Sequence, residues 1–371
     1  MTTGPLTSAG TTGSLEPLVV DVFGIAVAVL PTRAEHRARW AAQWSRALVE
    51  GVEPAAVVDT ASLDADDVHT LDQTLTSRVT MAALKEVGTT RFSLHAAGLT
   101  DGTGRTLALV AASGTGKTTA ARTLGRHFGY LTDETVSVGP DLDVLPYEKP
   151  LSLVLDPDVP TRKRQQPPDE LGLLAPTLPA VLERLVGLRR RPDDEPGLRP
   201  LSSSEAVAML VPQTSYITAF SHPVLELTRL VERVGGAWEL RYADIGEHVD
   251  DLRGLLDSDD RLEGEQWVHL PGVPQDAASP PPGTLVRAPW HDAVAFDDAV
   301  VVLREASSFR LEDLTHTLWL ALAEPRSRSE LAAAAVEVHG DHPDADVLVD
   351  QALAVLVDSD LAVAHTLELL G

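Results

Sequence analysis

The stretch LALVAASGTGKTT, residues 107–119, joins a short apolar strand to a glycine-rich turn and to the start of a helix. A turn of small residues lets consecutive backbone N–H groups face phosphate oxygens, and the following helix adds the positive end of its dipole. Glycine is favoured there because a Cβ would obstruct that approach. The sequence therefore predicts a nucleotide-binding loop. The residues expected to contact the nucleotide are Ala112, Ser113, Gly114, Thr115, Gly116, Lys117, Thr118 and Thr119.

Two side chains of this loop have separate predicted roles. Lys117 is expected to contact the β- and γ-phosphates, and the Thr118 hydroxyl is expected to bind Mg²⁺. ATP and Mg²⁺ are therefore the predicted cofactors. The usual pattern has glycine where Ala111 stands, so the match is to SGxGKT and not to the full string. A chance glycine turn before a helix is the alternative interpretation.

Two carboxylates follow on the next predicted strand. Residues 130–138, YLTDETVSV, place Asp133 beside Glu134, and phosphoryl transfer needs carboxylates to hold the metal ion and to activate the acceptor hydroxyl. Neighbours on a strand point to opposite faces, so both can serve one site only where the strand ends or bends. His95, on the strand before the loop, is either a catalytic residue or a half-buried structural histidine.

The segments around the loop alternate between strand and helix. Strands are predicted at 92–99, 107–112 and 130–138, with a helix at 117–128, so a parallel or mixed α/β sheet is expected. Further helices are predicted near 178–188, 203–211 and 224–234. Upstream, LVVDVFGIAVAVL at 18–30 predicts a strand, and a helix at 33–49 carries an apolar stripe that includes Trp40 and Trp44.

Composition narrows the class of protein. The 371 residues carry 55 acidic against 30 basic side chains and a net charge of −25, which disfavours nucleic acid as a partner. Cysteine is absent, which excludes disulfides, thiolate metal sites and cysteine nucleophiles and indicates a cytoplasmic protein. The longest apolar run is too short for a membrane span, and the N-terminus lacks the pattern of a secretory signal.

Residues 94–152 resemble the HPr kinase/phosphorylase-like superfamily, in which a histidine precedes the nucleotide loop and an acidic pair follows on the next strand. The resemblance implies a P-loop α/β core related to that of phosphoenolpyruvate carboxykinase, which uses ATP and Mg²⁺ to phosphorylate a serine. It places His95 on the family histidine and Asp133 and Glu134 on the acidic pair. The segment PYEKPLS, with Lys149, is similar to one in smaller HPr kinase homologues and implies a nucleotide-binding role for that lysine. The implied catalytic residues are Asp133, Glu134, His95 and Lys117, and the implied metal ligands are Thr118, Asp133 and Glu134.

The sequence differs from the family pattern in two ways, and these differences narrow the activities and residue roles that the resemblance implies. The acidic pair is Asp-Glu where bacterial HPr kinases have Asp-Asp, which leaves open which carboxylate is the base and which binds the metal. A second signature of those enzymes, rich in Gly and Ile, is absent. HPr is therefore not the expected substrate, and phosphorylase activity is not expected.

The C-terminal part predicts a separate module. Strands are expected at 285–288, 293–296 and 300–304, followed by helices at 311–322, 327–338 and 345–357, which is a winged-helix pattern. Because residues 283–371 carry five Arg against 16 Asp and Glu, a peptide or protein partner is favoured over DNA. This region resembles the PqqD-like domains that bind leader peptides of ribosomally made, modified peptides. The resemblance implies that the leader adds a strand at a sheet edge, expected at Val300 to Leu303 beside helix 311–322.

The predicted organisation is a disordered leader (1–17), an N-terminal α+β segment packed on the core (18–89), a P-loop domain (90–270), a Pro-rich linker (271–283) and a PqqD-like winged-helix domain (284–371). The expected function is that of a serine kinase acting on a precursor peptide, similar to lasso-peptide kinases. Tethering the leader would raise the local concentration of the acceptor. The alternatives are a non-catalytic ATP-binding adaptor and a P-loop ATPase or nucleotidyl-transfer enzyme. The resemblance also implies a homo-oligomer.

Overall fold

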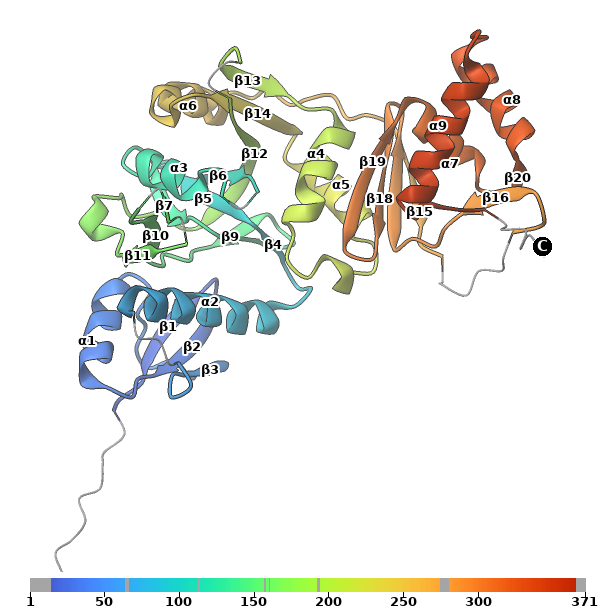
Figure 1. Cartoon of the computed structure of the whole chain (residues 1–371). Coiled ribbons are helices and arrows are strands. Elements are labelled where there is room, and N and C mark those ends of the chain that lie inside the picture. The colour runs from blue at the N-terminus through green and yellow to red at the C-terminus, as the bar shows by residue number, and fades with distance from the viewer. Residues whose placement is uncertain are drawn as a thin grey trace, which may run out of the picture.

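The computed structural model describes residues 15–63, 67–112, 114–156, 158–159, 161–191, 194–273 and 280–364. The predicted leader up to residue 14, Ser113 of the glycine-rich loop, residues 274–279 of the predicted linker and the chain from 365 onward lie outside these ranges. The described chain is a mixed α/β protein built on several sheets, in agreement with the sequence prediction of an α/β fold (Figure 1). No helix within the described ranges is both long and apolar enough to cross a bilayer.

The N-terminal group is a small sheet in the order β1-β2-β3, packed against two helices. The predicted strand at 18–30 is a hairpin that reverses at Phe23 and Gly24, where both residues have positive φ. Trp40 and Leu75, from the two helices, are buried in its core. The elements are β1 (Leu18–Val22), β2 (Ile25–Leu30), α1 (Ala34–Gln43), β3 (Ala56–Asp59) and α2 (Val68–Val87).

The central sheet follows the order β4-β8-β9-β12-β6-β5-β7, with β14 also paired to β12 and β13 paired to β14. It is mixed, because β12 runs parallel to β6 and β14 whereas β5 is antiparallel to both of its partners. A separate hairpin, β10 with β11, lies beside it. The strands are β4 (Phe92–Leu94), β5 (Ala96–Thr100), β6 (Arg105–Val110), β7 (Gly129–Thr132), β8 (Val136–Val138), β9 (Asp143–Leu145), β10 (Leu151–Val154), β11 (Lys163–Gln166), β12 (Ala180–Arg190), β13 (Gly197–Pro200) and β14 (Ala237–Tyr242).

Helices cover both faces of the central sheet. Alternate residues of β6 divide between two cores: Leu107 and Leu109 pack with α3 and α6, while Ala108 and Val110 pack with α4 and α5. This division places the helix that follows the glycine-rich loop and helix α5 on opposite faces. The helical elements are α3 (Lys117–Leu124), η1 (Asp169–Leu171), α4 (Ser203–Leu210), η2 (Val211–Gln213), η3 (Ile217–Ala219), α5 (Pro223–Arg233), η4 (Ile245–His248) and α6 (Val249–Asp257).

The prediction of a helix at 178–188 is wrong, because this segment is strand β12. Leu182, Leu185 and Val186 have the i, i+3, i+4 spacing of a helical face, which explains the error. In the structure every residue from Arg184 to Leu188 is buried, since β12 is covered on both faces and flanked by neighbouring strands. A strand in that position needs no alternation of polar and apolar residues.

The C-terminal sheet has the order β15-β17-β18-β19, and a smaller sheet, β20-β16-β21, accompanies the last helices. Helices α4 and α5 lie between the central sheet and the C-terminal sheet (Figure 1), and Val294 and Val301 join the same core as these helices. The elements are β15 (Trp267–Pro271), β16 (Thr284–Arg287), β17 (Asp292–Phe296), β18 (Ala299–Arg304), β19 (Ser307–Glu312), α7 (Asp313–Ala321), β20 (Arg326–Ser327), α8 (Arg328–His339), α9 (Ala345–Asp358) and β21 (Ala362–Ala364).

The predicted edge strand at Val300 to Leu303 is not an edge. These residues belong to β18, which is hydrogen-bonded to β17 on one side and to β19 on the other. All four side chains are fully buried, as expected when an unbroken apolar run fills an interior strand. Within the described residues, the edges of the C-terminal sheet are β15 and β19.

Candidate active site

The sheet topology brings the predicted site residues to one edge. Strands β6 and β7 are both antiparallel to β5, so they run in the same direction, and their C-terminal ends lie at the same edge of the sheet. This edge is the one formed by the ends of the strands. The glycine-rich loop follows β6, and Asp133 and Glu134 follow β7 directly. His95 immediately precedes β5 at this edge, where Ala96 pairs with Val110, the last residue of β6. Segments from separate strands therefore converge on one place.

The loop has the backbone conformation that its glycines allow. Gly114 and Gly116 adopt φ values of +80° and +102°, in the left-handed region that favours glycine. Apart from its chain neighbours, no described residue would lie within 4 Å of a Cβ placed on Gly114, so the space beside it is open to the rest of the described chain. Helix α3 begins at Lys117, and no side chain of the described residues caps its first N–H groups. Those donors are free to bind an external acceptor.

The side chain of Lys117 folds back against the glycine-rich loop that precedes it. Its Nζ donates to the carbonyl oxygens of Ala111 (2.5 Å) and Ala112 (3.1 Å), and only 6% of the residue is exposed. Burial lowers the pKa of Lys117 to about 8, although the charges of Glu134 and Asp133 oppose that change. The ammonium group is thus close to both the loop backbone and the acidic pair.

The acidic pair faces a buried lysine. The chain bends after β7, and Lys149 Nζ lies 2.7 Å from Asp133 Oδ1 and 3.2 Å from Glu134 Oε2. The Lys149 and Asp133 side chains are 1% and 2% exposed, whereas the Glu134 side chain is 37% exposed. Burial alone would lower the pKa of Lys149, but the two carboxylates outweigh it and raise the pKa above its usual value. The bend therefore lets neighbouring carboxylates serve one site, with Glu134 the more accessible.

His95 is half-buried beside these charges. Burial lowers the pKa of His95 below its usual 6.5, and the positive charge of Lys117 lowers it further, while Glu134 and Asp133 partly oppose the shift. The imidazole is therefore neutral at pH 7 and able to accept a proton or a hydrogen bond. The histidine, the lysine and the acidic pair influence one another electrostatically.

The remaining predicted loop residues surround this centre. Thr118 is half-buried in the first turn of α3, and Ala112, Thr115 and Thr119 are exposed. The Thr115 hydroxyl donates to the Ala112 carbonyl (2.6 Å). Ser113 lies outside the described residues. The sequence predicts Lys149 to bind the nucleotide, whereas in the structure its ammonium group contacts the two carboxylates.

Two tyrosines at the site were not predicted from the sequence. The buried Tyr130 hydroxyl lies 3.2 Å from Asp133 Oδ1 and 3.1 Å from the Lys149 carbonyl oxygen, so its single proton can be donated to either acceptor. Burial raises the pKa of Tyr130 well above 10, so the phenol stays protonated. Tyr242, at the end of β14, places its hydroxyl 3.6 Å from the position of a Cβ on Gly116. Tyr130 could have been suspected from its position three residues before Asp133. Tyr242 reaches the loop only through the pairing of β14, β12 and β6, for which the sequence holds no local signal.

The N-terminal group holds the segment that carries Lys149. Tyr147 packs edge-on against Phe23, with ring centroids 5.1 Å apart, and its hydroxyl is 2.7 Å from Thr80 Oγ1. Phe23 N donates to the Pro146 carbonyl (3.1 Å), and Arg46 pairs with Glu148 (3.2 Å). The contacts of the N-terminal group thus fix residues 146–148, which immediately precede Lys149.

Comparison with known proteins assigns no family to this chain. No protein-family model matches the sequence, and no curated protein matches it either.

Proposed function

We propose that this protein is an ATP- and Mg²⁺-dependent phosphotransferase of the HPr kinase-like type that phosphorylates a hydroxyl group of a precursor peptide. The observation that carries the proposal is the convergence of Lys117, His95 and the pair Asp133–Glu134 at one edge of the central sheet. These residues come from different segments, and a lysine with two carboxylates is the set of groups that phosphoryl transfer uses. The buried ammonium group and the acidic pair beside the turn favour this proposal over a chance glycine turn.

The residues around the loop suit a nucleoside triphosphate with its metal ion. The uncapped start of α3, the open space at Gly114 and the ammonium group of Lys117 would hold the phosphates. Thr118 and Glu134 would hold Mg²⁺, because Glu134 is the accessible member of the acidic pair. The bound metal neutralises charge on the phosphates, and ATP supplies the transferable group.

The other carboxylate is placed to act as the base. Asp133 Oδ1 accepts from Tyr130 and lies against Lys149, while among the described residues Oδ2 has no hydrogen-bond partner. We assign Oδ2 as the atom that accepts the proton of the acceptor hydroxyl. Lys149 is a positioning residue, because its contact with both carboxylates fixes their orientation.

The C-terminal sheet offers an edge for an extended peptide. The resemblance to PqqD-like domains implies a leader bound at a sheet edge beside a helix, and β19 is an edge strand that leads directly into α7. We therefore propose β19 as the docking strand in place of residues 300–303. Its backbone groups on the unpaired side would bind the leader and hold the acceptor near the loop.

Intact-mass analysis tests this proposal. Small precursor peptides encoded beside this chain are incubated with the protein, ATP and Mg²⁺, and a kinase adds about 80 Da per event. The gain should be lost with Lys117→Ala and Asp133→Asn and retained with Lys85→Ala, which changes an exposed lysine of α2. ADP release without peptide labelling would support an ATPase instead, addition of AMP a nucleotidyl-transfer enzyme, and neither product an adaptor.

A further inference from the structure

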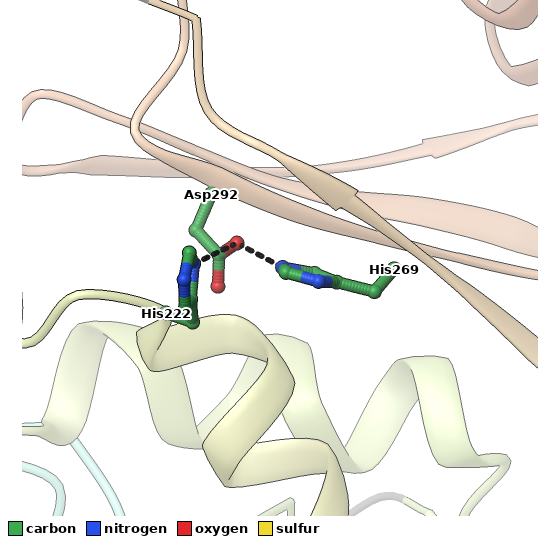
Figure 2. Close-up of side chains that lie close together, drawn as sticks. All are labelled: His222, His269 and Asp292. Atoms are coloured by element: carbon green, nitrogen blue, oxygen red, sulfur yellow. Dashed lines mark hydrogen bonds and ion pairs between the residues drawn. The ribbon is translucent and has the colours of Figure 1, made fainter.

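We propose that His222, His269 and Asp292 form a binding site for a transition metal ion of the Zn²⁺ class. His222 precedes α5, His269 lies on β15 and Asp292 begins β17, and Figure 2 shows the three side chains turned toward one another. Their ligand atoms all lie within 4.8 Å of one another. The site lies where the C-terminal sheet meets α5, on the face of the central sheet opposite α3, and is separate from the nucleotide loop.

The spacing of the ligand atoms fits a metal ion after small side-chain movements. His269 Nε2 is 2.7 Å from Asp292 Oδ1, and His222 Nδ1 is 3.8 Å from the same oxygen. Ligand atoms bound to tetrahedral zinc at about 2.0–2.2 Å are roughly 3.3–3.5 Å apart, a value between the two observed distances. The imidazole rings are nearly perpendicular, at 80°, with centroids 5.0 Å apart, so they approach the carboxylate from different directions.

Asp292 carries a buried negative charge that a bound cation would compensate. Its side chain is fully buried, and within the described residues its ion-pair partners are the two histidines, with no Lys or Arg among them. A buried carboxylate is costly unless a positive charge and hydrogen bonds compensate for the lost hydration. A divalent ion would supply the charge that no lysine or arginine provides.

The second carboxylate oxygen of Asp292 holds this side chain in a fixed orientation. Asp292 Oδ2 accepts from the backbone N–H groups of Val224 (2.8 Å) and Leu225 (3.1 Å), in the first turn of α5. These bonds orient Oδ1 toward the histidines, as outer hydrogen bonds orient the ligands of metal sites. The carboxylate is thus held in place before any ion arrives.

The donor set selects the class of metal. Two imidazole nitrogens and one carboxylate oxygen suit Zn²⁺ and related ions, whereas Mg²⁺ and Ca²⁺ prefer oxygen ligands. The side chain of His222 is 47% exposed, which leaves room for water as a fourth ligand. The ion would connect α5 to β15 and β17, and so join the C-terminal sheet to the helices of the central sheet.

Metal titration of the full chain tests this site. The protein is stripped with EDTA and titrated with Co²⁺, whose visible absorption reports tetrahedral coordination, and with Zn²⁺ under native mass spectrometry. We expect one ion per chain and a higher melting temperature with Zn²⁺. His222→Ala should weaken binding at least tenfold and reduce the rise in melting temperature. This variant should fold, because the side chain is half exposed and makes no hydrogen bond within the described residues; far-UV circular dichroism checks that.

His127→Ala is the matched control, because His127 is an exposed histidine remote from the cluster in sequence. It should bind the ion as the wild type does. The proposal is overturned if the wild-type chain binds no stoichiometric ion. It is equally overturned if His222→Ala binds as tightly as the wild type, or if both variants lose affinity equally. Because neither measurement involves ATP, the result is independent of the proposed kinase activity.

Discussion

Replacing Lys149 with methionine should lower the free energy of unfolding of the protein by about 3–5 kcal/mol, the usual effect of removing one partner of a buried ion pair. The side chains of Lys149 and Asp133 are 1% and 2% exposed and lie 2.7 Å apart. In Lys149→Met the buried Asp133 carboxylate keeps only the Tyr130 hydroxyl as a side-chain partner among the described residues. Because methionine is nearly as long as lysine, little of the loss comes from an empty cavity.

The pH dependence of this effect has a definite sign. The folded protein raises the pKa of Lys149 above 10.5, so the stabilisation is fully present below that value and is lost only as pH rises through the higher folded pKa. The difference in the free energy of unfolding between the wild type and Lys149→Met should therefore stay constant between pH 6 and pH 9.

A double variant that removes both charges tests the contribution of the pair to stability. Urea denaturation gives the free energy of unfolding, and hydrogen exchange of peptides covering 129–138 reports the local effect. The double variant Asp133→Asn/Lys149→Met removes both charges and should recover most of the loss. Lys85→Met, at an exposed position of α2, should leave stability within about 0.5 kcal/mol of the wild type. A loss of less than about 1 kcal/mol in Lys149→Met, or a double variant no more stable than Lys149→Met, would show that the pair does not stabilise the fold in this way.

Three further predictions concern the loop, the acidic pair and the N-terminal group. Because the pKa of Lys117 is about 8, its ammonium charge is lost as pH rises, and a pH profile of kcat/KM for ATP should fall above pH 8 in the wild type but not in Lys117→Arg. Glu134→Gln should raise the Mg²⁺ concentration needed for half-maximal turnover by about tenfold or more, measured by metal titration; an unchanged requirement would remove Glu134 from the metal site. Tyr147→Phe loses the hydrogen bond to Thr80 and should cost about 1 kcal/mol in urea denaturation, whereas no change would show that this bond does not hold the segment.

The local part of the site could be predicted from the sequence, because it lies within one strand, loop, helix and strand. The glycine-rich loop and the acidic pair are separated by fewer than twenty residues, and their chemistry depends on residue type and order. The requirement that the strand bend at Asp133 and Glu134 followed from strand geometry, and β7 does end at Thr132.

The rest depended on contacts between distant segments. Because β12 is buried on both faces, residues 178–188 lack the alternation of polar and apolar residues that marks a strand, and their spacing predicts a helix instead. The sequence predicts an edge at Val300 to Leu303 of β18, although the continuous apolar character of this run suits an interior strand. Tyr242 and the cluster of His222, His269 and Asp292 come together only through the packing of separate strands and helices, which no local pattern encodes.

Calorimetric titration with ATP in the presence of Mg²⁺ asks whether the loop after β6 binds a triphosphate through Lys117. We predict that the wild type and Lys85→Ala bind ATP with equal affinity and bind adenosine far more weakly. Lys117→Ala should bind ATP about tenfold to hundredfold more weakly, because it loses a charge-assisted contact to the phosphates. Equal affinity of Lys117→Ala and the wild type for ATP, or equal affinity of the wild type for ATP and adenosine, would contradict triphosphate binding by this loop through Lys117.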